Sequence, residues 1–187
     1  MVLAITIIRK EGDTRVKKIS IVEVVAYKHV WKEKYRQIKE HLLAHVGDLV
    51  LACEHVGSTS VEGLAAKPII DLDLVMESYD QLPEIILRLQ QIGYVHEGTL
   101  GIEGREAFRR ETAGSFMNHH LYVCPKDGKG YLEHIAFRDY LRGNGEACRQ
   151  YGELKQRLAE QYRTDRAAYG EAKTAFITSI LNMDDLS

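Results

Sequence analysis

The chain has 187 residues, of which 45% are apolar and 28% charged, and its 25 Lys and Arg against 27 Asp and Glu give a formal net charge of -2. This composition is typical of a folded soluble domain and excludes a disordered or fibrous chain. Because basic residues are not in excess, we expect no non-specific binding to nucleic acid.

The cysteines and the apolar runs exclude further classes. Cys53, Cys124 and Cys148 are odd in number and widely spaced, so neither a disulfide framework nor a structural zinc site is expected. No run reaches the roughly 20 apolar residues that cross a bilayer, and the first eight residues lack the basic start of a signal peptide. We expect a cytoplasmic protein with no membrane partner, either a monomer or a homodimer.

The first 130 residues predict a mixture of strands and helices. Residues 2–9 and 16–25 are rich in β-branched side chains, and the polar segment between them predicts a hairpin. Apolar residues at helical spacing, each time followed by a glycine, predict helices at 29–46 and 82–92. Further strands are predicted at residues 49–56, 68–76, 94–96, 106–111 and 118–124.

From residue 131 the pattern is helical, with interruptions near 143–145 and 164–165, which predicts three helices. Tyr151-Gly-Glu-Leu-Lys155 and Tyr169-Gly-Glu-Ala-Lys173 nearly match, but two short copies do not make a repeat architecture, and we interpret them as coincidence. Strict alternation of strand and helix is absent, so the fold class is α+β, with a mixed or antiparallel sheet flanked by helices. One domain over 1–187 is expected, with 1–20 as an extension and 131–187 as a helical part.

The residues most suggestive of chemistry lie around Asp71 and Asp73. Successive side chains of a strand point to opposite faces, so both carboxylates face one way while Ile70 and Leu72 face the core. Such a pair is tolerated where a divalent cation bridges it, and Mg²⁺ typically takes one or two carboxylates together with phosphate and water. The alternative is a strand end whose acids pair with Lys or Arg.

The turn before this strand has the composition of a phosphate site. Gly57-Ser58 at a strand end would let backbone N–H groups approach a phosphate. Thr59 and Glu62 have the spacing of a capping box, which predicts a short helix beginning there. Lys67 would either meet a phosphate or offset the two aspartates.

These motifs carry a family resemblance. Gly57-Ser58 and Asp71-Leu72-Asp73 match the signature of the nucleotidyltransferase superfamily, and further matches are EHVGST at 54–59, GLAAKPIID at 63–71, GRE at 104–106, HHLYV at 119–123 and FRDYLR at 137–142. From about residue 21 to 180 the chain resembles the GrpB family (UPF0157) of predicted nucleotidyltransferases. The resemblance implies a nucleotidyltransferase-like fold that moves a nucleoside monophosphate from a nucleoside triphosphate to a small-molecule or protein acceptor.

The resemblance also implies roles for individual residues. Asp71 and Asp73 would be catalytic and bind Mg²⁺ or Mn²⁺, and Gly57, Ser58 and Thr59 would bind phosphate. A third acid is usual on a later strand, but residues 118–124 contain none. His120, facing the same way as Tyr122, is the candidate for that position because histidine can serve as general base and metal ligand near neutral pH.

The helix predicted from residue 131 adds one candidate. His134, Arg138 and Arg142 share a polar stripe, and the planar guanidinium of Arg138 would grip phosphate oxygens or form a surface ion pair. Asp139 falls on the apolar side, so we expect it to cap a loop or pair with a basic residue. Lys155 and Lys173 would reach a substrate only if their helices line the cleft.

Three functions are compatible with these residues. The first is Mg²⁺-dependent nucleotidyl transfer. The second is nucleotide binding without turnover, and the third is a metal-dependent phosphohydrolase that uses Asp71, Asp73 and His120. Nucleotidyl transfer releases pyrophosphate, binding without turnover releases neither phosphate product, and a phosphohydrolase releases orthophosphate.

Overall fold

The computed structural model describes residues 21–111 and 115–184, so the hairpin predicted for 2–9 and 16–25 lies mostly outside the described residues. A five-stranded sheet has the order β1-β2-β5-β4-β3. Its neighbours pair antiparallel except for β2 and β5, which are parallel. The strands are β1 (Ala52–Val56), β2 (Ile70–Met76), β3 (Tyr94–Gly98), β4 (Glu106–Arg110) and β5 (His119–Pro125). The mixed sheet confirms the predicted α+β class.

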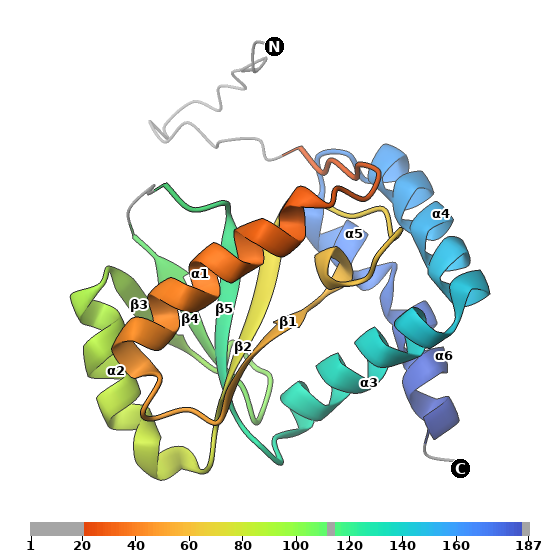
Figure 1. Cartoon of the computed structure of the whole chain (residues 1–187). Coiled ribbons are helices and arrows are strands. Elements are labelled where there is room, and N and C mark those ends of the chain that lie inside the picture. Colours follow the sequence, from red (N-terminus) through yellow and green to blue (C-terminus); the bar gives the residue numbers. More distant parts are fainter. Residues whose placement is uncertain (1–20, 112–114, 185–187) are drawn as a thin grey trace, which may run out of the picture.

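Two helices cover one face of the sheet (Figure 1). They are α1 (Val30–Val46) and α2 (Leu82–Gln91), the second preceded by the short 3-10 helix η2 (Tyr79–Gln81). Their buried side chains, such as Trp31 and Ile85, share one apolar core with Leu72 and Leu121 of the central strands. Because side chains alternate along a strand, the odd-numbered residues of β2, including the two aspartates, face the opposite side of the sheet.

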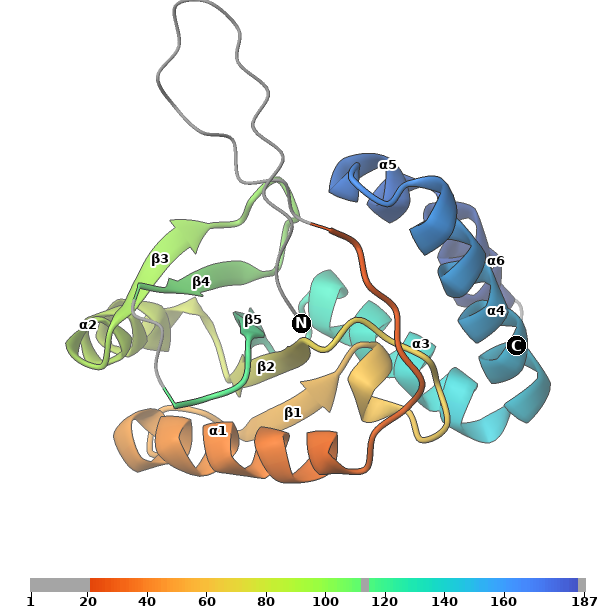
Figure 2. The same ribbon diagram turned by 90° about the horizontal axis from the view of Figure 1, so that it is seen from above.

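Four helices rather than three form the C-terminal part: α3 (Lys129–Gly143), α4 (Gly145–Gln161), α5 (Arg166–Glu171) and α6 (Thr174–Asp184). The two expected breaks are present, and each is fixed by a side-chain cap: Asn144 accepts from the Ala147 N–H and Asp165 from the Ala168 N–H. Figure 2 shows α4, α5 and α6 grouped together on the side of the molecule away from α1 and α2.

Separate apolar clusters join these helices to the turns around the sheet. One cluster packs Val61 and Leu64, which follow β1, against Leu141 of α3 and Tyr151 of α4. In another, Val22 packs against Leu158 and Tyr169. The described end of the predicted second hairpin strand, residues 21–25, makes a single β-bridge between Val25 and Ala66. These contacts hold the C-terminal helices against the segment that leads into β2.

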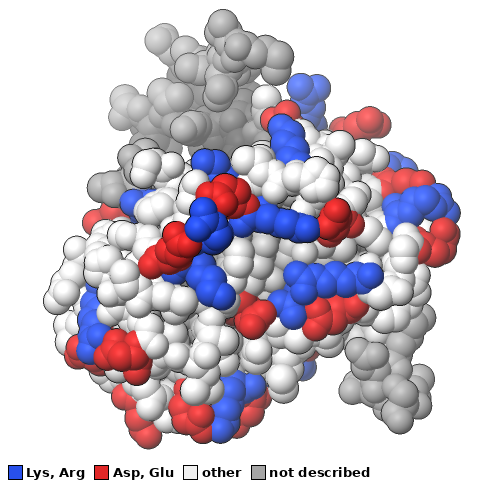
Figure 3. Space-filling model, in the orientation of Figure 1, with Lys and Arg blue, Asp and Glu red and all other residues white. Residues whose placement is uncertain are grey.

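Charges of both signs alternate over the face shown in Figure 3, so this face carries no continuous basic surface. Ion pairs within single helices contribute to that alternation: Arg36 contacts Glu33 and Glu40 on α1, and Arg149 contacts Glu146 and Glu153 on α4. Among the helices described, none is long and apolar enough to span a bilayer.

Candidate active site

Asp71 and Asp73 lie on one face of β2, as the alternation predicts, but their environments differ. The side chain of Asp71 is 28% exposed, whereas that of Asp73 is completely buried. Asp71 pairs in register with His120 of β5, and Asp73 with Tyr122. The parallel pairing of β2 and β5 thus sets two acids beside a histidine and a tyrosine, which confirms that His120 and Tyr122 share the face of the aspartates.

Each carboxylate holds one imidazole. Oδ1 of Asp71 lies 2.7 Å from Nδ1 of His120, and Oδ2 of Asp73 lies 2.8 Å from Nδ1 of His134 on α3. The ring of Tyr122 stands between the two histidines, and the Arg105 guanidinium lies 4.2 Å from its centre. Burial raises the pKa of Tyr122 to about 12, so this hydroxyl is neutral at physiological pH.

The buried carboxylate of Asp73 is only partly satisfied. Its Oδ1 has no hydrogen-bond partner among the described residues, and burial raises the pKa of Asp73 against the opposing hydrogen bond from His134. Burial alone would lower the pKa of His134, but its hydrogen bond to Asp73 and the charge of that carboxylate raise it above the usual value. The pair therefore keeps a carboxylate in place that has one oxygen left to bind another group.

The donor atoms suit a divalent cation that also binds phosphate. Within residues 21–111 and 115–184, no three His, Cys, Asp or Glu side chains form a ready metal cluster. Nδ1 of His120 contacts Asp71. Two carboxylates with one unpartnered oxygen fit Mg²⁺, which commonly completes its shell with phosphate oxygens and water. Asp71 and Asp73 are the residues that would hold it.

The turn after β1 is shaped around Asp71. Gly57 has φ +66°, and a Cβ built on it would lie 2.3 Å from Oδ2 of Asp71. Only glycine permits this approach of backbone to carboxylate. Ser58 follows as the first residue of the 3-10 helix η1 (Ser58–Ser60), so the Gly57-Ser58 backbone adjoins the first aspartate.

Replacing Gly57 with alanine should destabilise the fold and displace Asp71. With φ +66° and ψ -176°, Gly57 lies in a region that is nearly exclusive to glycine and costs other residues roughly 1–3 kcal/mol, and the clash with Asp71 adds to it. Gly63 provides the matched control because it has φ +83° and a Cβ at that position would meet nothing within 4 Å. Urea unfolding should show a larger loss for Gly57→Ala than for Gly63→Ala, and equal losses would mean that the contact with Asp71 is unimportant.

The capping-box prediction at Thr59 is wrong in its mechanism. A short helix does begin here, but its N-cap is Gly57 and no side chain caps it. Thr59 is buried, donates from Oγ1 to the carbonyl of Ile69, and contacts Nε2 of His55. Glu62 pairs with Lys32 on α1. Thr59 therefore ties the turn to the start of β2, and its hydroxyl is committed to that bond.

Three lysines from separate segments converge on the side of Asp71. Lys67 precedes β2, Lys155 belongs to α4, and Lys173 lies between α5 and α6. The amines of Lys67 and Lys173 lie 5.4 and 4.7 Å from the ring centre of Tyr169. The amine of Lys155 lies 4.6 Å from the ring centre of Tyr151. Asp71 acts electrostatically on all three.

This lysine cluster, defined as Lys67, Lys155 and Lys173, holds more positive charge than its surroundings balance. Burial lowers the pKa of Lys155 to about 7, assisted by the charge of Lys173, and that of Lys67 to about 8, assisted by Arg166 and Lys173. Lys155 is 2% exposed, and its amine has no hydrogen-bond partner in the described part of the chain. A buried, unpartnered ammonium is costly, so the cluster is suited to an anion.

Arg138 lies close to the site with its nitrogens already engaged. Its guanidinium contacts Glu54 at 2.7 Å, the carbonyl of His55, and Asp139 at 2.8 Å, with 10% of the side chain exposed. Glu54 is the register partner of Asp73. Asp139 pairs with a basic residue as expected, although half of its side chain is exposed and not buried on the apolar side. The ion-pair alternative for Arg138 is thus the arrangement that the structure contains.

Removing His134 should cost stability because it leaves a buried charge without its partner. For His134→Leu we expect a loss of about 3 kcal/mol in the free energy of unfolding at pH 7. His29, whose side chain is 80% exposed, is the control, and His29→Leu should change stability by less than about 0.5 kcal/mol. Urea denaturation measures both, and a His134→Leu loss as small as the control's would show that Asp73 does not need this histidine.

Sequence patterns do not indicate that His134 is a partner of Asp73. They also do not show that Lys155 and Lys173 come close to Asp71. His134 lies on the predicted polar stripe, but 61 residues separate it from Asp73 and no local pattern indicates the contact. For Lys155 and Lys173 a signal exists in the repeated Tyr-Gly-Glu-x-Lys segment. Each copy sets a tyrosine four residues before a lysine, and each lysine packs on that tyrosine.

Comparisons with known proteins agree with this architecture. The GrpB protein family model matches residues 21–183. The glutamate-rich protein GrpB of Alkalihalophilus pseudofirmus is 35% identical over 164 residues, which cover 86% of this chain and 94% of that protein. The crystal structure of conserved protein GrpB from Enterococcus faecalis is similar with a TM-score of 0.75 and 33% identity, covering 84% of this chain and 94% of that one.

A more distant likeness concerns the fold alone. A structure of the Cid1 poly(U) polymerase bound to MgATP superposes with a TM-score of 0.50 at 11% identity, over 79% of this chain and 50% of that one. The mixed sheet with its flanking helices is accordingly a nucleotidyltransferase-like fold. With a family model that spans nearly all described residues and a relative matched over almost its full length, this chain belongs to the GrpB protein family.

Proposed function

We propose that this protein transfers a nucleoside monophosphate from a nucleoside triphosphate to an acceptor hydroxyl or similar nucleophile. The observation that carries the proposal is the lysine cluster within electrostatic reach of Asp71, with the buried amine of Lys155 lacking any partner among the described residues. Acids beside unbalanced ammonium groups match a metal-bound triphosphate, which presents a cation and several phosphate oxygens at once.

Each group then has a chemical task. Asp71 and Asp73 hold Mg²⁺ or Mn²⁺, which neutralises charge on the phosphates when bound. The Gly57-Ser58 backbone and the lysine cluster bind the phosphates that leave, and Thr59 supports the turn through its bond to the Ile69 carbonyl. Arg138 is left out of the phosphate site because Glu54 and Asp139 occupy its nitrogens.

His120 supplies the base for the acceptor. Its Nδ1 faces the Asp71 carboxylate at 2.7 Å, and a carboxylate there favours the tautomer that carries the proton on Nδ1 and the lone pair on Nε2. A neutral imidazole in that form can take a proton from an attacking hydroxyl. The missing third acid of the later strand is replaced, on this proposal, by the Asp71–His120 pair.

Calorimetric titration with ATP, GTP, CTP and UTP, with and without Mg²⁺, tests the proposal before any acceptor is known. At least one nucleotide should bind with micromolar to millimolar affinity in the presence of Mg²⁺ and more weakly without it. Inorganic phosphate should bind less tightly than the nucleotide, because it engages fewer of the lysines. Failure of all four nucleotides to bind under either condition would contradict the proposal.

A further inference from the structure

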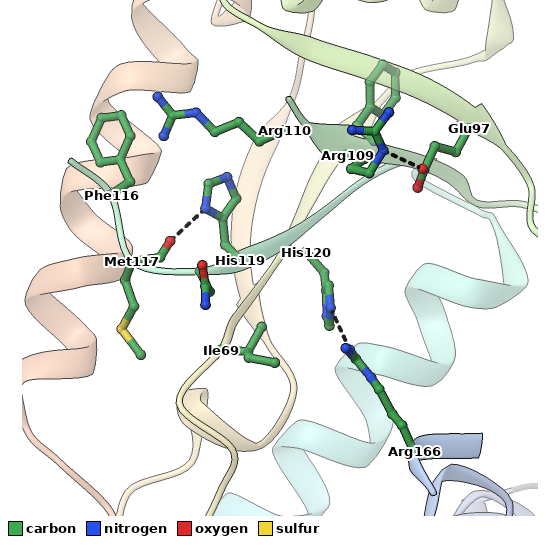
Figure 4. A pocket seen from close by; sticks show the side chains of 11 residues that line it. Ile69, Glu97, Arg109, Arg110, Phe116, Met117, His119, His120 and Arg166 are labelled. Carbon is green, nitrogen blue, oxygen red and sulfur yellow. Dashed lines mark hydrogen bonds and ion pairs between the residues drawn. The ribbon is translucent and has the colours of Figure 1, made fainter. Parts of the chain in front are cut away.

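A cavity adjoins His120 on the side of β2 away from Gly57. This pocket of about 580 Å³ lies where β2 and β5 begin, and residues of β3, β4, β5 and the start of α5 line it. Figure 4 shows His120 and Arg166 meeting at one side of the pocket, with Arg110, Phe116 and His119 at the other. Its volume lies within the range typical of sites for small molecules.

The sheet order places this pocket and the phosphate turn on opposite flanks of Asp71. Val56 of β1 pairs with Asp71, and Gly57 follows it directly. On the other flank of β2, His120 of β5 pairs with Asp71, and β4 and β3 lie beyond. Phosphoryl-group transfer needs the attacking and leaving oxygens roughly in line. A donor whose phosphates meet the Gly57-Ser58 turn therefore leaves the His120 flank for the acceptor.

The charges of the pocket favour an anionic ligand. Its single carboxylate, Glu97, is paired with Arg109 at 2.9 Å. Neither Arg110 nor Arg166 forms an ion pair with any carboxylate of the described segments, and Nε of Arg110 is buried without a hydrogen-bond partner. The guanidinium of Arg110 lies instead 4.8 Å from the ring centre of Phe116. Arg110 lies on the face of the sheet that carries Tyr94 and Phe108, whereas Arg166 meets His120 on the opposite face. The unpaired guanidinium of Arg166 is therefore the group suited to a carboxylate or phosphate beside His120.

We infer that this pocket is the acceptor site and that the acceptor is a small molecule bearing both a hydroxyl group and a carboxylate or phosphate. The inference rests on the proposed function. Arg166 holds the anionic group, Asn118 adds a polar side chain to the lining, and the hydroxyl points to Nε2 of His120. The hydroxyl oxygen bonds to the α-phosphorus as the bond from that phosphorus to the β-bridging oxygen breaks. The electron pair of the broken P–O bond leaves with pyrophosphate, and the hydroxyl proton passes to Nε2 of His120.

Arg166 makes this base dependent on the acceptor. In the structure, Nη2 of Arg166 lies 3.2 Å from Nε2 of His120 and engages the lone pair that catalysis requires. A carboxylate or phosphate is a stronger partner for a guanidinium than a neutral ring nitrogen, because the hydrogen bond is then charge-assisted on both sides. Binding of the anionic acceptor thus draws Arg166 away and frees Nε2.

The test compares the binding of matched probes to the full chain. Calorimetry is carried out with three probes at millimolar concentration. Of these, sn-glycerol 3-phosphate carries a phosphate, glycerate carries a carboxylate, and glycerol is the uncharged control. At least one of the anions should bind and glycerol should not. Arg166→Gln should weaken anion binding about 10-fold or more and lower the affinity for ATP by a smaller factor, because Arg166 also acts on Lys67. Arg110→Gln, on the other face of the sheet, should leave both affinities as in the wild type. Arg149→Gln, which removes an exposed arginine of α4, should change neither affinity.

The outcomes separate this inference from the proposed function. ATP binding without anion binding, or anion binding that survives Arg166→Gln, overturns the acceptor site and leaves the nucleotide site intact. Anion binding without nucleotide binding overturns the proposed function and, with it, the role of the pocket as an acceptor site. Binding of a fluorescently labelled short oligoadenylate is measured last. Tight binding of this RNA that is lost in Arg166→Gln would overturn the small-molecule acceptor and indicate a polynucleotide acceptor.

Discussion

Replacing both Asp71 and Asp73 with asparagine should abolish the effect of Mg²⁺ on nucleotide binding and reduce nucleotidyl transfer about 100-fold or more. Asparagine keeps the shape of aspartate but loses the charge that holds a divalent cation, and bound metal contributes several kcal/mol to such a transition state. Titration of ATP with and without Mg²⁺ measures the first effect. Transfer of label from α-labelled ATP measures the second.

The double variant should still fold, which keeps its result interpretable. Asp73 is buried with a raised pKa, and an amide at that position removes a buried charge while still accepting from His134. Asp80 and Asp127 are exposed, so the double variant Asp80→Asn, Asp127→Asn removes the same two charges outside the site. This control should leave nucleotide binding and transfer unchanged. Unaltered Mg²⁺-dependent binding in the Asp71 and Asp73 variant would remove these residues from the site.

Replacing Lys155 with methionine should have two opposite effects: a more stable protein and a weaker nucleotide complex. Methionine fills the space of the buried stem but carries no ammonium to desolvate. We expect the free energy of unfolding at pH 6 to rise by roughly 2–4 kcal/mol and the affinity for ATP to fall about 10-fold. Few substitutions raise stability while lowering function, so this pattern is characteristic of a charge kept for its ligand.

The stability gained by Lys155→Met should depend on pH, and the pKa of Lys155 sets the direction of that dependence. The folded-state pKa of Lys155 is about 7 against an ordinary value of 10.5. Below pH 7 the amine is protonated in both states, so the full cost of burying the charge is present. As the pH rises from about 7 to 10.5, the folded protein has already released the proton that the unfolded chain retains. The advantage of Lys155→Met over the wild type should therefore shrink steadily across this range.

Lys28 is the matched control because its side chain is exposed. Lys28→Met should alter stability by less than about 0.5 kcal/mol and should not change the affinity for ATP. Urea unfolding at pH 6, 8 and 10 measures the first quantity for both variants. If Lys155→Met is destabilising at pH 6, the buried amine has a compensating partner, and the argument for an anion site there fails.

The central strand and the first helices could be predicted because their signals are local. The period-2 pattern of β2 identified its core face and the common face of Asp71 and Asp73, and helical periodicity located α1 and α2 to within one or two residues. At the C-terminus the breaks at Asn144 and Asp165 were predictable from residues that cap helices. The further break between α5 and α6 was not, since Gly170 is the only local signal in that segment.

The assembly of the site could not be predicted because it depends on contacts between distant segments. Asp73 and His134 are 61 residues apart, and Arg166 and His120 are 46 apart. Arg138 shows the same limit: its stripe on the helix left a phosphate ligand and an ion pair as alternatives, and Glu54, 84 residues away, forms the ion pair. Side-chain type and spacing identified the candidates, but only the packing of the C-terminal helices against the sheet and the turns around it selects their partners.

The most direct test of nucleotidyl transfer is the identity of the phosphate product. The purified chain is incubated with Mg²⁺, α-labelled ATP and a metabolite extract filtered to remove macromolecules, and pyrophosphate and orthophosphate are quantified separately. Nucleotidyl transfer predicts pyrophosphate release, α-label in a new small molecule, and loss of both in the Asp71→Asn, Asp73→Asn variant. Orthophosphate release, or nucleotide binding with no release of either product, would contradict it and favour a phosphohydrolase or a non-catalytic nucleotide-binding protein.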